Sequence, residues 1–317
     1  MSDQITDTRI ILSSPVALDR NPAAVYIASL PAKSGQRTQA QALRVIAGIF
    51  KTDLNFLNWG AIRYQHTALI RAELAKRYSA SSANKIMSAL RQALKQAWLL
   101  GDMSAEDYRR AIELKPITGE TIPAGRELSQ GEILALFNAC KRDETPAGTR
   151  DAAIIAIMYA AGLRRQEIVN LSLGSFDCDS GQIILTGKRN KQRTAYLSDG
   201  GLAAVNDWLA IRGADGDSLF VSINKGGVLD TTKPLTAQAI YNMLAKRAAE
   251  AEVKSFSPHD LRRTFVSDLL DKGADIATVS KMAGHANVQT TARYDRRPEE
   301  AKKKAAGLLH VPYKSKS

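Results

Sequence analysis

Apolar side chains recur every three or four residues through the first third of the chain, a spacing that places them on one face of a helix. The first such stripe follows Thr38 and consists of Leu43, Ile46, Ile49 and Phe50. Gln41 stands three residues after Thr38, which has the form of a capping box and predicts that the helix starts at Thr38. Two further stripes predict helices over residues 67–78 and 82–100, and Gly101 ends the second of them.

The periodic pattern stops soon after the third predicted helix. Residues 113–127 read ELKPITGETIPAGRE, and proline and glycine without an apolar period are typical of a linker. A length of 317 residues also favours two domains, because single hydrophobic cores seldom grow beyond about 250–300 residues. We therefore expect a helical domain over residues 1–116, a linker over 117–127 and a second domain over 128–317.

The second domain mixes helical stripes with two β-prone runs. Ser129 and Glu132 have the spacing of a capping box, and the segment 151–161 is almost wholly apolar, as a central buried helix would be. Helices are predicted over residues 129–139, 151–161, 236–251, 258–271 and 275–283. Gly273 and Gly284 end the last two of these helices. The runs 182–186 and 193–197 flank a basic Gly-Lys-Arg-Asn-Lys tip and predict a hairpin. The expected fold class is mainly α with a small antiparallel β-sheet, the second domain being α+β.

Charge and composition narrow the class of partner. Hydrophobic residues make up 44% and charged residues 24%, which excludes disordered and collagen-like chains. Lysine and arginine number 44 against 32 acidic residues, which gives a formal net charge of +12. This excess favours nucleic acid or an acidic membrane surface, and charge alone does not choose between them.

The sequence gives no sign of a membrane segment, a disulfide framework or a metal site. No apolar run approaches the ~18 residues of a membrane span, and the first residues lack the charged and apolar parts of a signal peptide. Cys140 and Cys178 have no second pair at metal-ligand spacing. We expect a cytoplasmic protein without a membrane span and without a bound metal or cofactor.

Four separate segments carry basic and nucleophilic groups beside the ends of predicted elements. They are Gly-Leu-Arg-Arg-Gln-Glu at 162–167, the basic hairpin at 187–193, Ser-Pro-His-Asp-Leu-Arg-Arg at 257–263, and Gly-His at 284–285 followed nine residues later by Tyr294. Each segment is a weak signal by itself, because an arginine after a buried helix usually makes a structural ion pair.

Together, in this order, the four segments resemble those of the tyrosine recombinase (integrase) family, which includes phage integrases and Xer resolvases. The resemblance is close over residues 150–297, and the N-terminal helices are similar in kind to the family's core-binding domain. It implies a site-specific recombinase that cuts and rejoins DNA through a 3′-phosphotyrosyl bond without metal or ATP. Fixed cations suit such chemistry, because the charge of a phosphodiester repels nucleophiles and grows in the transition state.

The resemblance also implies a role for each site residue. Arg164 and Arg262 would hold the non-bridging phosphate oxygens, since a planar guanidinium can bind two of them. Tyr294 would be the nucleophile and His259 its proton acceptor. Lys188 would protonate the leaving 5′-oxygen, with Lys191 as the alternative. His285 would hydrogen-bond a phosphate oxygen, and Glu167 would orient active-site groups.

Other residues receive weaker assignments. Asp260 and Arg263 are interpreted as structural, the aspartate favouring a helix start. Contacts with DNA backbone are expected from a further set of basic side chains, namely Lys85, Arg91, Lys95, Lys191 and Arg193. In the tail at 301–317, Leu308, Leu309 and Val311 are expected to dock on a neighbouring protomer.

The resemblance implies double-stranded DNA with short inverted-repeat sites as the partner. The expected assembly is a homo-tetramer on two sites, joined by exchange of the C-terminal tails, with a possible accessory DNA-bending protein. The absence of an arm-binding domain and of an insertion between Lys188 and His259 favours a simple Xer-like or transposon-type enzyme, associated with the nucleoid. Two alternatives remain open: a type IB topoisomerase-like enzyme and a catalytically silent DNA-binding regulator.

Overall fold

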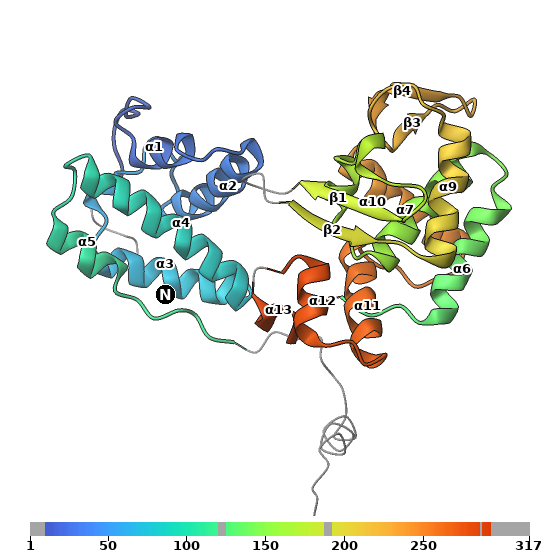
Figure 1. Ribbon diagram of the computed structural model, residues 1–317. Coiled ribbons are helices and arrows are strands. Elements are labelled where there is room, and N and C mark those ends of the chain that lie inside the picture. Colours follow the sequence, from blue (N-terminus) through green and yellow to red (C-terminus); the bar gives the residue numbers. More distant parts are fainter. Residues whose placement is uncertain (1–9, 120–124, 187–191, 286, 293–317) are drawn as a thin grey trace, which may run out of the picture. The chain divides into compact units, whose positions relative to one another are not determined.

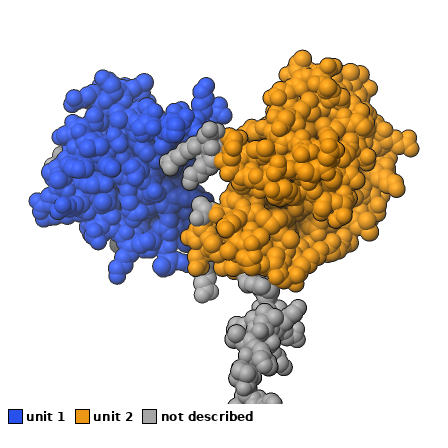
Figure 2. Space-filling view, viewed as in Figure 1, with its two compact units in different colours: residues 1–123 blue, residues 124–317 orange. Residues whose placement is uncertain are grey.

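The computed structural model describes residues 10–119, 125–186, 192–285 and 287–292. The chain divides into two compact units, Met1–Pro123 and Ala124–Ser317 (Figures 1 and 2). The division falls inside the segment 117–127 that the sequence predicts as a linker. Each unit has its own apolar core. No helix in the described parts of the chain is both long and apolar enough to cross a membrane.

The first unit is helical and is built around its longest helix, α4 (Figure 1). Ile86, Leu90 and Leu94 of α4 are buried at the helical spacing that predicts this element. The other helices of the unit contribute buried side chains such as Leu43, Ile70 and Trp59 to the same core. The elements are α1 (Pro22–Ala28), α2 (Lys33–Ile49), η1 (Trp59–Ala61), α3 (Tyr64–Arg77), α4 (Ala80–Leu99) and α5 (Ala105–Ile112).

The predicted start of α2 is wrong. The helix begins at Lys33, and the Thr38 hydroxyl donates to the Ser34 carbonyl at 2.9 Å instead of capping the helix. The exposed side of the helix is polar, and the Thr-x-x-Gln pattern is part of that polar side and not a capping box at the helix start. Helix α4 begins two residues before the predicted 82, since the Ser79 hydroxyl accepts from the Ser82 amide at the N-cap.

The segment that follows α5 packs back on the first unit as far as Ile117. The Asn84 side chain donates to the Ile117 carbonyl at 2.8 Å and accepts from its amide at 2.9 Å. Arg91, predicted to contact DNA, donates to the Leu114 carbonyl at 3.1 Å. Part of the Arg91 guanidinium therefore serves to hold this segment, and α4 carries Lys85 and Lys95 exposed.

The second unit is mostly helical with two small antiparallel sheets. Its helices are α6 (Gln130–Arg142), α7 (Pro146–Ala160), α8 (Arg165–Val169), η2 (Leu173–Ser175), α9 (Asp199–Arg212), α10 (Ala237–Glu250), α11 (Pro258–Asp271), α12 (Ile276–Ala283) and α13 (Val288–Ala292). Strands β1 (Gln182–Thr186) and β2 (Gln192–Tyr196) form the predicted hairpin. Strands β3 (Val221–Ile223) and β4 (Leu229–Pro234) form a second sheet, so the expectation of a single sheet is incomplete.

Helix α7 is the centre of this unit. Ile154, Ile155 and Ile157 are fully buried, and the helix packs against α6, α9 and α11. Asp151, at 2% exposure, carries a charge into this core. It is compensated by the buried Arg247, whose Nε donates to an Asp151 oxygen at 2.9 Å, as a buried charge requires. This ion pair supports the fold between α7 and α10.

Candidate active site

Helix α11 positions His259 and Arg262 one turn apart at its N-terminal end. Pro258 opens the helix, and the Asp260 carboxylate accepts from the Ser257 amide at 2.7 Å, which fixes the start. Arg263 donates to the Gly125 carbonyl at 3.1 Å. These bonds give Asp260 and Arg263 the structural part that was predicted for them, and His259 and Arg262 line the same pocket.

The Arg262 guanidinium joins two loops by hydrogen bonds. Only 2% of the residue is exposed, and its guanidinium donates to the Gly162 carbonyl at 2.6 Å and to the Ala283 carbonyl. These carbonyls belong to the segments that carry Arg164 and His285. Neither carbonyl carries a net charge, so these two bonds do not neutralise the guanidinium.

Gly162 allows the Arg164 loop to approach α11 closely. Its φ of +62° is in the left-handed region that favours glycine, and a Cβ here would lie 2.4 Å from the Phe265 ring. The glycine therefore permits both the turn and the packing that bring the Gly162 carbonyl to Arg262.

Arg164 is held firmly and is still accessible. Its backbone amide donates to a Glu167 oxygen at 2.8 Å, and its guanidinium contacts the other Glu167 oxygen at 3.0 Å and the Gly284 carbonyl at 3.2 Å. The Arg164 side chain is 46% exposed. Burial raises the pKa of Glu167, but the hydrogen bond from the Arg164 amide and the charges of Arg193 and Arg164 lower it below its ordinary value, so the carboxylate is ionised. Glu167 contacts Arg164 in the way that an orienting residue would.

Arg193 was expected to face DNA or solvent, but the structure turns its side chain toward the protein. Its guanidinium donates to Glu167 Oε2 at 2.8 Å and to the Met282 carbonyl at 2.8 Å, and its side chain is only 19% exposed. A Cβ on Gly284 would lie 2.6 Å from Arg193 Nε, so the two residues are packed together. Arg193 thus joins β2 to the segments of Arg164 and His285. The strand register explains this inward position of Arg193. Arg193 is the cross-strand partner of the buried Leu185, and cross-strand partners point to the same face of the sheet.

His285 and His259 are both held in the neutral form. Gly284 ends α12 in the left-handed conformation, and His285 Nδ1 lies 2.8 Å from the Thr291 hydroxyl, a partner that the sequence did not suggest. Burial, followed by the charges of Arg262 and Arg164, lowers the pKa of His285 to about 4. Burial and then Arg262 also lower the pKa of His259. A neutral imidazole near pH 7 can accept a proton.

We expect NMR titration of the free protein to show these two shifts. The His285 imidazole should titrate near pH 4 and that of His259 below the ordinary pH 6.5. Between about pH 4 and 6.5 the unfolded chain then binds more protons, so the free energy of unfolding should rise with pH across this window. The chain has four histidines, so single His→Gln variants assign the signals. A His285 midpoint at or above 6.5 would contradict the arrangement described.

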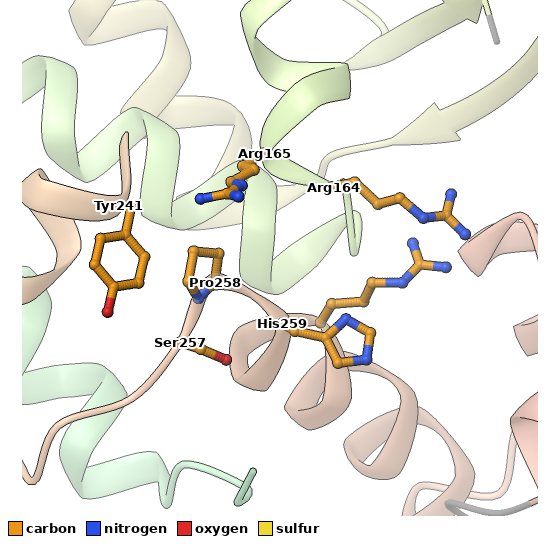
Figure 3. A pocket seen from close by; sticks show the side chains of 7 residues that line it. Arg164, Arg165, Tyr241, Ser257, Pro258 and His259 are labelled. Atoms are coloured by element: carbon orange, nitrogen blue, oxygen red, sulfur yellow. The ribbon is translucent and has the colours of Figure 1, made fainter. Parts of the chain in front are cut away.

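Arg164, His259 and Arg262 line one wall of a pocket of about 370 Å³ (Figure 3). The remaining lining residues are Arg165, Tyr241, Ser257 and Pro258, from α8, α10 and the start of α11. Three of the seven side chains are arginines and none is a carboxylate. A pocket with this excess of positive charge suits an anion with several oxygens.

Several predicted site residues lie outside the part of the chain that the structure describes. They are Lys188, Lys191, Tyr294 and the tail residues Leu308, Leu309 and Val311. The described residues bring together Arg164, Glu167, His259, Arg262, His285 and Arg193.

Among the described residues, one group places His, Cys, Asp or Glu side chains close enough to share a cation. It consists of the exposed Asp177, Cys178 and Asp179, ahead of β1. The Asp177 carboxylate already accepts from the Ser180 hydroxyl at 2.7 Å and from the Asp179 amide at 2.9 Å, bonds that lower its pKa. None of the three lines the arginine-rich pocket, so the group has no part in that site.

Comparison with known proteins gives a consistent result over most of the chain. Residues 126–300 match the model of the phage integrase family. The chain is similar to tyrosine recombinase XerC of Alcanivorax borkumensis, with 29% identity over 77% of this chain and 78% of the relative. It is also similar to XerC of Xylella fastidiosa, with 30% identity over 73% and 75%, and to XerD of Yersinia pestis, with 28% identity over 77% and 84%.

The fold is also similar to that of solved structures. The Tn1549 transposon integrase, in complex with a circular intermediate DNA, superposes with a TM-score of 0.70 at 14% identity, over 94% of this chain and all of that one. XerH recombinase bound to difH substrate gives a TM-score of 0.66 at 20% identity, over 92% and 84%. A lambda integrase dimer bound to a core site gives 0.64 at 14% identity, over 89% and 96%.

Proposed function

Because the chain belongs to the phage integrase family of tyrosine recombinases, we propose that it is a site-specific recombinase that cuts and rejoins DNA through a phosphotyrosyl bond on Tyr294. The observation that carries the proposal is the convergence of Arg164, Arg262 and His259 on one pocket whose lining holds no carboxylate. Such a pocket is complementary to a phosphodiester and to the charge that grows on it during attack.

In the proposed reaction the Tyr294 oxygen attacks the scissile phosphorus, and the bond from phosphorus to the 5′-oxygen breaks. Neutral His259 accepts the phenolic proton, and Lys188 gives a proton to the leaving 5′-oxygen. The products are a 3′-phosphotyrosyl bond and a free 5′-hydroxyl. A 5′-hydroxyl from another strand reverses these steps and rejoins the DNA. The covalent linkage conserves the energy of the broken bond, so the reaction needs no ATP.

The arginines would act on the non-bridging phosphate oxygens. The exposed Arg164 fork can bind two of them, while Arg262 adds its charge to the lining of the pocket. Glu167 and Arg193 would keep Arg164 in place, since the Glu167 carboxylate joins the two guanidiniums. His285 would donate a further hydrogen bond to the phosphate.

The proposed partner is double-stranded DNA with short inverted-repeat sites. It is supported by the net charge of +12 and by three similar structures, which are in complex with a circular intermediate DNA, a difH substrate and a core site. Residues 1–116 would form the core-binding domain and residues 128–317 the catalytic domain, with backbone contacts supplying most of the affinity. Four protomers on two sites, joined by their C-terminal tails, would complete the assembly in the cytoplasm, with an accessory DNA-bending protein where the site requires one.

A plasmid assay distinguishes strand exchange between two sites from cleavage and rejoining of one strand without exchange. We expect the protein to recombine a supercoiled plasmid that carries two copies of a site taken from the DNA flanking its gene, with EDTA present and ATP absent. A matched plasmid without the sites should stay supercoiled. Equal relaxation of both plasmids without exchange would contradict site-specific recombination and indicate a topoisomerase-like enzyme. Binding without any change in the DNA would indicate a silent regulator.

A further inference from the structure

The arginine-rich pocket extends beyond the residues to which the proposed reaction gives a role. Arg165 from the first turn of α8 and Tyr241 from α10 line it together with Arg164, His259 and Arg262. Figure 3 shows the Arg165 guanidinium directed toward the Tyr241 side of the pocket, while the Arg164 guanidinium is directed away from Tyr241. Two neighbouring arginines thus serve different parts of one pocket.

Arg165 differs from the other two arginines in its partners. Arg164 is paired with Glu167, and Arg262 is bonded to two backbone carbonyls. Within the residues that the structure describes, the Arg165 side chain forms no hydrogen bond or ion pair, and the residue is exposed. Its charge therefore contributes nothing visible to the fold and is available to an external anion.

Tyr241 presents a polar atom from the neighbouring helix. It is 44% exposed, whereas its neighbours Ile240 and Leu244 on α10 are buried in the core and hold the helix in place. The Tyr241 side chain therefore lines the pocket from a helix that is fixed in the core. A tyrosine hydroxyl can donate one hydrogen bond to a phosphate oxygen.

We propose that Arg165 and Tyr241 bind a second DNA phosphate, next to the one that Arg164 and Arg262 hold. This inference rests on the proposed function, because it takes the occupant of the pocket to be a DNA strand. Successive phosphates of one strand are separated by about 3.4 Å along the duplex axis, so a strand seated on Arg164 brings a second phosphate close by. Binding both phosphates fixes the position of the strand along the pocket and places the scissile phosphorus for attack.

The salt dependence of DNA binding tests this role without requiring cleavage. We expect Arg165→Gln to reduce the slope of log K against log[salt] on a 30-base-pair duplex by about 0.9, the effect of one lost phosphate contact. Tyr241→Phe removes an uncharged donor, so it should leave the slope unchanged and weaken binding by about tenfold. Arg142→Gln is the matched control, since Arg142 is an exposed arginine on α6 that does not line the pocket and should leave the slope unchanged.

The proposal would be overturned if Arg165→Gln kept the wild-type slope, or if Arg142→Gln reduced the slope by as much as Arg165→Gln does. Thermal unfolding of each variant checks that the fold is retained. A second test uses a duplex that the wild type cleaves, with a neutral methylphosphonate in place of the phosphate next to the cleaved one. This change should weaken DNA binding by the wild type and not by Arg165→Gln. Equal weakening of both proteins would also overturn the proposal. The slope is measured without the reaction, so failure of the proposed function, seen as no cleavage by the wild type, is distinguished from failure of the second phosphate site.

Discussion

Replacing Arg262 by Lys is expected to slow formation of the covalent protein–DNA adduct by about a hundredfold to a thousandfold. The guanidinium of Arg262 binds the Gly162 and Ala283 carbonyls together, at 2% exposure of the residue, and adds a fixed positive charge to the pocket. An ammonium is a compact point charge without a planar fork, so it cannot keep both carbonyls and the phosphate in the same geometry. The lysine keeps the charge and loses the fork, and loss of one preorganised donor typically costs about 10²–10³ in rate.

Rates of adduct formation under single-turnover conditions measure this effect, with thermal unfolding recorded in parallel. Arg263→Lys is the matched control, because Arg263 is the next residue on the same helix and donates to the Gly125 carbonyl instead of lining the pocket. The Arg263 variant should cleave within about tenfold of the wild type. If Arg262→Lys keeps a rate within tenfold while folded, Arg262 does not stabilise the reacting phosphate.

The fold could be predicted from the sequence where a stripe and an end signal agree. Helix α11 has the predicted bounds because Pro258 starts it and its apolar side chains recur on one face. Helix α5 escaped detection because only Ala111 of its eight residues is buried, so the segment carries no apolar stripe. Strands β3 and β4 escaped because β4 reads LDTTKP, a polar run with little β signal.

The site could be predicted only in part. Arg164, His259, Arg262 and His285 were identified through the resemblance of their segments to the tyrosine recombinase family, and the structure brings these segments together at α11. The partnership of Arg193 with Glu167 depends on which face of β2 meets α8, which a single sequence does not state. The Thr291 hydroxyl reaches His285 through the tertiary packing of α12 and α13, which are short and have no motif of their own.

Tyr294→Phe is expected to abolish the covalent adduct altogether and to leave DNA binding unchanged. The variant keeps the ring and loses the one oxygen that would attack phosphorus, so no step of the proposed reaction can begin. Binding depends on the basic side chains of both units, which the change does not touch. Tyr196→Phe is the matched control, because Tyr196 is an exposed tyrosine on β2 whose hydroxyl contacts the Gln182 side chain at 3.4 Å.

Covalent trapping on nicked duplexes therefore tests whether Tyr294 is the nucleophile. Wild type, Tyr294→Phe and Tyr196→Phe are incubated with nicked duplexes from the DNA that flanks the gene, denatured and resolved by size. We expect a denaturant-resistant adduct with wild type and Tyr196→Phe and none with Tyr294→Phe. An adduct that persists in Tyr294→Phe would show that another residue attacks the DNA, and no adduct from a wild type that binds the same duplex would show that the protein does not form a phosphotyrosyl bond.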